Sequence, residues 1–254
     1  MRKKLQSITG KLYSLTAIAV LLLLWQGLCV FGIVPDYMLP SPLEVIQAFA
    51  NDFPFLMSNA GTTLMEAFLG LLAGILIGFF VAVGMDHFDG VYQAVYPLVV
   101  LTQTVPTVAI APLLILWLGP SMAPKIVLII IVTFFPITVG LLDGFRSADG
   151  DMVNLLRSMG ATKFQIFRMI KIPSSLSHFF ASLRISASYS IVGAVISEWL
   201  GGYEGLGVYM TRVKKSFAFD KMFAVIFLIS AISLLLIGGV NLLQKKCMPW
   251  EEKV

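Results

Sequence analysis

Three ionisable side chains stand out because each lies within or at the end of a long apolar run. Glu66 lies about one turn inside such a run, and Arg184 and Glu198 lie near the two ends of another. A charge in hydrocarbon is costly, so an ionisable residue there is a functional candidate by default. Near an interface the same side chain can reach water or pair with an opposite charge. For Glu66 and Arg184 both interpretations stay open.

A second group of polar residues surrounds a proline in the run at 92–119. Pro97, Pro106 and Pro112 each remove a backbone donor and are expected to kink or break a helix. Broken helices at membrane depth are tolerated where they line a cavity or pack on protein. Hydrogen bonds between helices are an equally weighted alternative role for the polar side chains. The candidates for lining a solute path are Gln103, Thr104, Thr107 and Glu198.

The sequence contains none of the common catalytic motifs. It has no Gly-x-x-x-x-Gly-Lys-Ser/Thr phosphate loop, no His-Glu-x-x-His and no Gly-x-Ser-x-Gly. His87 and His178 are isolated, and Cys29 and Cys247 are expected on opposite faces of a membrane, where they cannot pair. We therefore expect no metal, no cofactor and no catalytic residue. Any ATP hydrolysis would have to come from a separate subunit.

Composition indicates an integral, all-α membrane protein. Of 254 residues, 58% are hydrophobic and 13% charged, with a mean hydropathy of +0.90, whereas soluble domains have roughly 25% charged residues. A helix needs roughly 20 residues to cross the hydrocarbon. Six runs are long enough, which predicts six transmembrane helices in a domain over residues 12–243, between an N-terminal segment 1–11 and a tail 244–254. The runs are 12–33, 61–84, 92–119, 123–142, 177–200 and 220–243.

Small residues form two faces at four-residue spacing. Such faces allow two helices to approach closely, and they indicate packing rather than ligand binding. One face lies on the second run and the other on the fifth. Their members are Gly70, Gly74 and Gly78, and Ser182, Ser186 and Ser190.

The long polar stretch at 143–176 predicts two short helices joined by a glycine turn. Asp149 and Asp151 can cap the first helix, because their side-chain oxygens accept free N–H groups of a first turn. Gly160 is expected to end it in the left-handed conformation.

The second short helix should begin at a capping box and run to Pro173. Thr162 and Gln165 have the spacing of that box. A rigid two-helix connection is more than two spans need, since most helix connections have about 2–8 residues. We expect a docking surface here, with an amphipathic interfacial loop as the alternative.

The first loop between spans, residues 34–60, contains no Lys or Arg. Ser41, Pro42 and Glu44 occupy cap, first-turn and capping-box positions, which predicts a short structural helix.

The distribution of Lys and Arg predicts the orientation. Twelve lie in the N-terminus, the stretch from Arg146 to Lys171 and the tail. Four lie on the alternate side, and these are Lys125, Arg212, Lys214 and Lys215. Because positive loops stay in the cytoplasm, both termini and the polar stretch are expected there.

Two parts of the polar stretch resemble the EAA loop of ABC importer permeases. The first is Asn154-Leu-Leu-Arg-Ser-Met-Gly160, and the second is Ile170-Lys-Ile-Pro173. The glycine and the proline match the family pattern, while Asn154, Leu155 and Leu156 stand where the pattern has Glu-Ala-Ala. Residues 38–45, 97–126 and 196–210 also resemble the branch that serves nitrate, taurine, aliphatic sulfonates and thiamine or flavin precursors. Gln103-Thr-Val-Pro106 and Glu198-Trp-Leu-Gly-Gly are most similar to permeases for hydroxymethylpyrimidine or riboflavin.

This resemblance implies a type I, MetI-like importer fold in a bacterial cell membrane. It implies three partners: a cytoplasmic ATPase dimer, an external substrate-binding protein, and a second permease subunit that is either another copy or a different chain. It also implies that the polar stretch 143–176 is a cytoplasmic ATPase-coupling loop, in which residues 154–161 contact the ATPase and residues 170–173 form a brace; residues 154–173 together are called the coupling segment. The residues carried over to that role are Asn154, Leu155, Leu156, Arg157, Gly160, Ala161, Ile170 and Pro173.

Two other functional classes compete with an importer permease. An ion-coupled secondary transporter would favour charges near the middle of spans and an inverted repeat, and neither is clear in this sequence. A membrane-embedded enzyme would need a cluster of His or carboxylate side chains at one depth. We therefore expect a permease that moves a small organic solute without itself hydrolysing ATP.

Overall fold

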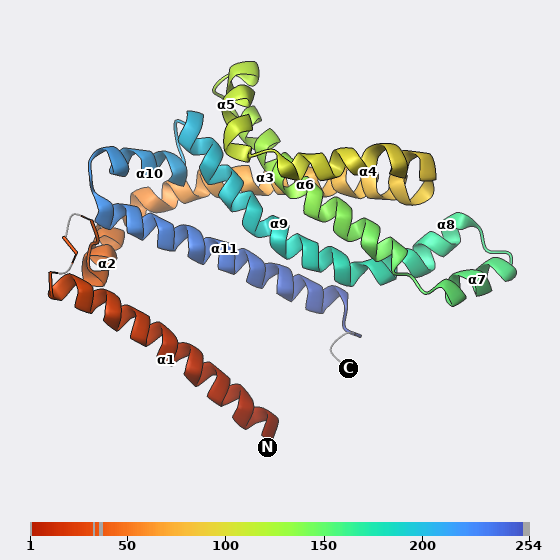
Figure 1. Cartoon of the computed structure of the whole chain (residues 1–254), viewed down its shortest axis with the longest axis horizontal. Helices are drawn as coiled ribbons and strands as arrows, with labels where there is room; N and C mark the ends of the chain where they lie inside the picture. The colour runs from red at the N-terminus through yellow and green to blue at the C-terminus, as the bar shows by residue number, and fades with distance from the viewer. Residues whose placement is uncertain (1, 33, 36–37, 251–254) are drawn as a thin grey trace. The chain divides into compact units, whose positions relative to one another are not determined.

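The computed structural model describes residues 2–32, 34–35 and 38–250, and this part of the chain is helical, without strands (Figure 1). The helices are α1 (Arg2–Val30), α2 (Pro42–Asn51), α3 (Phe53–His87), α4 (Asp89–Thr104), α5 (Thr107–Leu118), α6 (Met122–Arg146), α7 (Gly150–Ser158), α8 (Lys163–Ile166), the π-helical turn η1 (Phe167–Lys171), α9 (Ile172–Gly201), α10 (Leu206–Lys215) and α11 (Phe219–Cys247).

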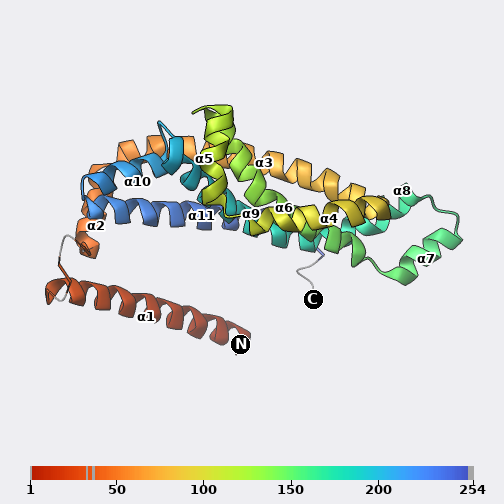
Figure 2. The same ribbon diagram turned by 45° about the horizontal axis from the view of Figure 1, so that its top comes forward.

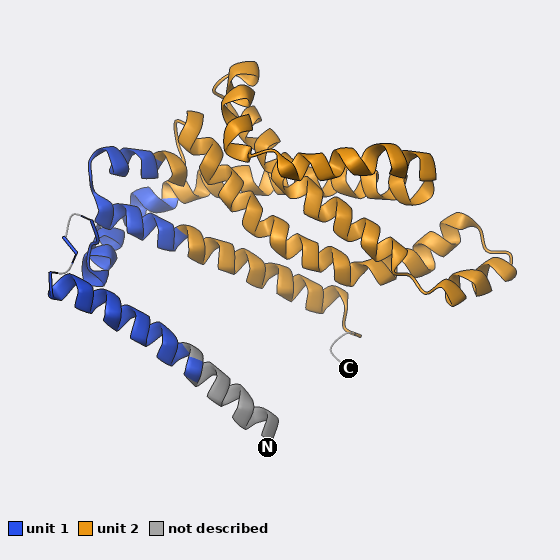
Figure 3. Cartoon of the chain, viewed as in Figure 1, with its two compact units in different colours: residues 1–57, 209–228 blue, residues 58–208, 229–254 orange. Residues whose placement is uncertain are grey.

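The chain divides into two compact units (Figure 3). Unit 1 comprises residues 1–57 and 209–228, and unit 2 comprises residues 58–208 and 229–254.

In the described part of the chain, four helical stretches are long and apolar enough to cross a membrane: Phe53–His87, Met122–Arg146, Lys163–Gly201 and Phe219–Cys247. The pair α4 and α5 qualifies only as one broken span, with a bend of 100° between its halves. The helix α1 contains the apolar segment Leu15–Val30, which lies within the first predicted run, and residue 33, where that run ends, lies outside the described residues. The protein is thus an all-helical, multi-pass membrane protein, and the count of six spans stays a prediction.

Unit 1 contains the predicted short helix α2. The Ser41 hydroxyl accepts a bond from the Glu44 N–H at 3.3 Å, and the Glu44 carboxylate accepts one from the Ser41 N–H at 2.7 Å. The predicted capping box is therefore confirmed. The helix buries Val45 and Ala48 against Ala224 of α11.

The partly buried carboxylate of Asp52 connects the end of α2 with α10 and α11 in unit 1. Asp52, just after α2, forms an ion pair with Lys221 at 2.8 Å and accepts a hydrogen bond from the Tyr209 hydroxyl at 2.6 Å. The bond from Lys221, followed by that from Tyr209, holds the pKa of Asp52 below its usual value. Burial and the same carboxylate raise the pKa of Tyr209. Asp52 therefore stays ionised, and Tyr209 stays a neutral donor to it.

In unit 2, α6 packs closely against both α3 and α9. A Cβ atom added at Gly70, Gly74 or Gly78 of α3 would collide with Ile129, Thr133 or Ile137 of α6. The small-residue face of the second run therefore lies directly on α6.

The serine face of α9 lies on α6 as well. The Ser186 hydroxyl donates to the backbone carbonyl of Thr133 at 3.1 Å. Ser182 fills the space beside Gly140, and Ser190 bonds the carbonyl of Ala187 in its own helix at 2.8 Å. Figures 1 and 2 show α6 and α9 running side by side.

One sequence-based boundary is wrong. The second helix of the polar stretch was expected to run to Pro173, but α8 continues through η1 into α9 as one helical stretch, Lys163–Gly201. In the π turn the Ile172 N–H donates to the carbonyl of Phe167, five residues back. Pro173 is the second residue of α9 and so lies inside this continuous stretch, to which it cannot supply an N–H.

The close contact between α3 and α6 generates a stability prediction. We expect Gly74→Ala to lower the stability of the purified protein by about 1–3 kcal/mol, because the new methyl group must displace Thr133. Gly61→Ala, on the same helix but with open space around its Cβ position, should be neutral or stabilising by up to about 1 kcal/mol. Thermal unfolding in detergent measures both, and equal effects would contradict the packing argument.

Candidate functional site

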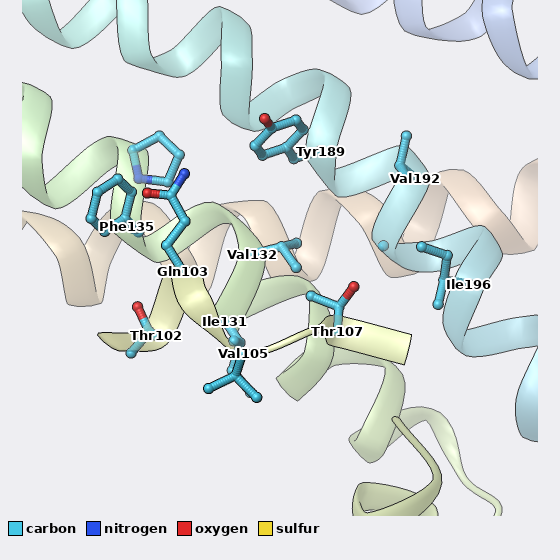
Figure 4. A pocket seen from close by; sticks show the side chains of 12 residues that line it. Thr102, Gln103, Val105, Thr107, Ile131, Val132, Phe135, Tyr189, Val192 and Ile196 are labelled. Carbon is cyan, nitrogen blue, oxygen red and sulfur yellow. The ribbon is translucent and has the colours of Figure 1, made fainter. Parts of the chain in front are cut away.

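A cavity of about 310 Å³ lies in unit 2 at the break between α4 and α5 (Figure 4). The chain leaves α4 at Val105 and begins α5 after Pro106, which has no N–H to continue a helix. Pro97 and Pro112, by contrast, lie inside continuous helices. The cavity is lined from α4, α5, α6 and α9 by Thr102, Gln103, Val105, Thr107, Ile131, Val132, Phe135, Pro136, Tyr189, Val192, Gly193 and Ile196.

The cavity combines apolar walls with a few uncharged polar groups. None of its lining residues is Asp, Glu, Lys, Arg or His. Figure 4 shows the amide of Gln103 directed toward Phe135, with Tyr189 projecting from the neighbouring helix. Mostly apolar walls with a few placed polar groups are typical of small-molecule sites.

The structure brings together two of the four path candidates. Gln103 and Thr107 line the cavity. The hydroxyl of Thr104 instead donates to the carbonyl of Leu101 at 2.9 Å, outside the cavity. Sequence reasoning missed Phe135 and Tyr189, although Tyr189 stands out in the sequence as a polar aromatic residue beside the serine face of α9.

Glu198, the fourth candidate, lies in a buried hydrogen-bond network rather than in the cavity. Its side chain is 1% exposed and accepts bonds from the Thr63 hydroxyl at 2.7 Å and from the Gly207 N–H at 2.6 Å. The Gly205 N–H donates to the Asn59 side chain at 2.9 Å. Side chains of α3 and α9 thus bond the backbone where α10 begins, as capping groups do.

Glu66 forms a buried ion pair with Lys125. The carboxylate and the ammonium lie 2.5 Å apart, with the two side chains 1% and 9% exposed. The second oxygen of Glu66 has no hydrogen-bond donor among the described residues. Arg184 forms no ion pair with a carboxylate of the described residues. It donates to the side-chain oxygens of Asn241 and Gln244 on α11.

The predicted helix, glycine turn and helix are present at the polar stretch. The Asp149 carboxylate accepts a bond from the Asp151 N–H at 2.8 Å and caps α7. Gly160 has φ +84°, and the N–H groups of Gly160 and Ala161 bond carbonyls of the last turn of α7. This is the Schellman pattern that left-handed glycine permits.

A second capping box begins α8. The Thr162 hydroxyl accepts a bond from the Gln165 N–H at 3.3 Å, and the Gln165 side chain accepts one from the Thr162 N–H at 2.7 Å. Lys171 then pairs with Asp86 at the end of α3, at 2.7 Å. The ring of Phe167 packs on Phe145 of α6, with centroids 5.1 Å apart.

The helix α7 is attached at its ends but buries none of its own side chains. Met152 and Leu155 are exposed on α7, Met159 is exposed at its C-cap, and Phe164 is exposed on α8. In Figures 1 and 2, α7 and α8 lie beyond the ends of α6 and α9. Exposed apolar side chains gathered on one element typically mark an interaction site.

The positions of the coupling residues follow from this geometry. Asn154, Leu155, Leu156 and Arg157 lie on α7, Gly160 and Ala161 form the turn, Ile170 lies in η1, and Pro173 lies in the first turn of α9.

The buried ion pair gives a second stability prediction. Glu66→Gln should cost about 3–5 kcal/mol, because it leaves the Lys125 ammonium buried without a counter-charge. The double variant Glu66→Leu with Lys125→Met should recover most of that loss, since both charges are gone. Thermal unfolding of the purified variants tests this, and a double variant less stable than the single one would refute the assignment.

Comparison with known proteins identifies the family. Residues 74–248 match the family model described as binding-protein-dependent transport system inner membrane component. The formylaminopyrimidine transport permease protein ThiX of Halalkalibacterium halodurans is 33% identical over 254 residues, covering 100% of both chains. A probable ABC transporter permease protein of Haemophilus influenzae is 34% identical, covering 89% of this chain and 93% of that one. Further relatives are permeases named for riboflavin, taurine, aliphatic sulfonates and nitrate.

Solved structures show the same fold. The MetNI methionine ABC transporter, in an inward-facing conformation, matches with a TM-score of 0.67 at 18% identity, over 77% of this chain and 97% of that one. The expectation of a type I importer fold is therefore confirmed. Permeases of this kind are membrane components that work with a separate ATPase and a binding protein. The chain belongs to the family of binding-protein-dependent transport system inner membrane components, and it is a permease subunit of an ABC importer.

Proposed function

We propose that the coupling segment, residues 154–173, links ATP hydrolysis by a partner subunit to the movement of a solute through this permease. The observation that carries the proposal is the exposed apolar face of α7, which is capped at both ends but covered by nothing among the described residues of this chain. A cytoplasmic ATPase dimer is the partner that would cover it.

A continuous helical path supports the transmission of force. The stretch Lys163–Gly201 runs from the coupling segment to the cavity, where it contributes Tyr189, Val192 and Ile196. Closure of the ATPase dimer would move α7 and α8, and α9 would carry that movement to the cavity. The coupling would act through a rigid element with two arrangements, inward-open and outward-open.

The proposed orientation places both termini, with the segments 1–11 and 244–254, in the cytoplasm. Twelve Lys and Arg residues lie on the side proposed as cytoplasmic and four on the opposite side, and this excess supports the orientation. The side chains of residues 2–12 and the segment 251–254 lie outside the described part, so their contribution rests on the sequence.

We further propose that Gln103 and Thr107 line half of a path completed by a second permease subunit, either another copy or a different chain. An external binding protein would deliver the solute. The full-length similarity to a formylaminopyrimidine permease supports a thiamine-precursor pyrimidine, and the riboflavin, taurine, sulfonate and nitrate relatives define the other candidates.

The glycine turn provides the test of coupling. Gly160→Val should abolish ATP-driven uptake while leaving membrane insertion intact, because a β-branched residue is strongly disfavoured at φ +84°. Gly150→Val is the matched control, since Gly150 lies in the same polar stretch with open space and an ordinary φ. Normal uptake by the Gly160 variant would refute the coupling role.

Co-purification in mild detergent tests the partners directly. We expect an ATPase to accompany the tagged chain and to be lost in the Gly160 variant. Uptake that follows an ion gradient, with no ATPase bound, would instead support a secondary transporter.

A further inference from the structure

A second cavity, of about 170 Å³, lies in unit 2 where the coupling segment is attached. It is lined from the end of α3 and from α7, α8 and η1, and its polar lining residues are Asp86, His87, Arg157, Lys163 and Lys171. We propose that this cavity binds a phosphate group, carried either by an anionic phospholipid or by free phosphate.

The charge of the lining favours an anion. Three cationic side chains and one carboxylate line the cavity, which leaves an excess of two positive charges with His87 counted as neutral. The ammonium of Lys171 lies 2.7 and 2.8 Å from the two carboxylate oxygens of Asp86, so these two charges neutralise each other. The excess charge therefore belongs to Arg157 and Lys163.

These two cations have no partner in the described part of the chain. Neither Arg157 nor Lys163 forms a hydrogen bond or an ion pair with a described residue. Arg157 lies in the last turn of α7, and Lys163 is the first residue of α8. Both line the same cavity although like charges repel, and a bound anion would relieve that repulsion.

The chemistry and the size of the cavity suit phosphate. The guanidinium of Arg157 presents a planar fork of N–H donors that can bind two phosphate oxygens at once, while an ammonium binds phosphate as a point charge. At about 30 Å³ for each water in the liquid, 170 Å³ corresponds to roughly five or six water molecules. A phosphate group fits this space, whereas the acyl chains of a lipid would have to lie outside it.

The cavity lies at the ends of two stretches long enough to cross a membrane. Asp86 and His87 are the last two residues of Phe53–His87, and Lys163 is the first residue of Lys163–Gly201. Lipid headgroups surround the ends of membrane spans. Basic pockets between membrane helices bind anionic headgroups, so a phospholipid phosphate has access to these side chains.

The cavity is not on the side of α7 that is proposed above to bind an ATPase. At about 100° per residue, Val153 and Arg157 point to nearly the opposite side of α7 from Met152 and Leu155. Val153 and Arg157 line the cavity, whereas Met152 and Leu155 form the exposed apolar face. A partner on that face would not fill the cavity, so the cavity calls for a ligand of its own.

Binding to the purified full-length chain in an uncharged detergent tests the proposal. Native mass spectrometry measures binding of dioleoylphosphatidylglycerol and of dioleoylglycerol, which lacks the phosphate. Inorganic phosphate is then added as a competitor, with chloride at equal ionic strength as its control. We expect the phosphatidylglycerol to bind and the dioleoylglycerol not to bind. Displacement by inorganic phosphate would identify free phosphate as a ligand, and lipid binding that resists it would identify the headgroup. Equal binding of both lipids, without any effect of phosphate, overturns the proposal.

Variants show whether binding occurs in this cavity. Arg157→Gln and Lys163→Gln should each weaken phosphatidylglycerol binding about fivefold, the effect of one basic side chain near an anionic lipid. Arg168→Gln removes the same charge from an exposed residue of η1 outside the cavity, and it should change binding less than about twofold, because solvent and salt screen its charge. Equal losses in all three variants would indicate unspecific attraction and would overturn the proposal.

Asp86→Asn should strengthen binding, because it removes the carboxylate and frees the ammonium of Lys171 for the phosphate. Misfolding cannot produce such a gain, and weaker or unchanged binding would contradict the electrostatic argument. Loss of a co-purifying ATPase in Arg157→Gln and Lys163→Gln, with phosphatidylglycerol binding unchanged, would assign the two cations to a protein partner and overturn the phosphate site. Since binding is measured without ATP or transported solute, these outcomes are independent of the coupling function proposed above.

Discussion

The close approach of α3 and α9 to α6 is the constraint on which the rest of unit 2 depends. Glycines on α3 and serines on α9 remove the side-chain bulk that would otherwise hold the helices apart. Without a hydrophobic driving force between helices in lipid, such contacts supply van der Waals packing and hydrogen bonds. The cavity walls and the attachment of the coupling segment both involve α6, through Phe135 and Phe145 respectively. A loosened α6 would therefore disturb both ends of the proposed mechanism.

The charged residues near the helix ends serve structure in every case for which the partner is visible. Glu66 pairs with Lys125, Lys171 with Asp86, and Glu198 accepts bonds from Thr63 and Gly207. The contacts of Glu66 with Lys125, of Lys171 with Asp86 and of Glu198 with Thr63 join elements that are distant in the sequence. The ionisable side chains thus make polar contacts between helices, whereas the residues that line the cavity at the α4–α5 break are all uncharged.

Local features could be read from the sequence, whereas long-range partners could not. The capping boxes at Ser41 and Thr162 and the left-handed turn at Gly160 depend on residues three or four positions apart, and all three are present as predicted. The continuation past Pro173 was missed because a π turn depends on a change of hydrogen-bond register that residue types do not reveal. The partner of Glu66 lies 59 residues away, and that of Glu198 lies 135 away. Similarly, the break at Pro106 identified Gln103 and Thr107, but only packing brings Tyr189 to them.

The neutrality of the cavity at the α4–α5 break affects how the membrane voltage acts on transport. Moving one elementary charge across the membrane changes the energy by about 2.3 kcal/mol for every 100 mV. A solute without net charge does no electrical work, and a lining without ionised groups moves no gating charge when the helices around it rearrange. Accumulation of such a solute through this path would be opposed by its concentration gradient and not by the membrane voltage.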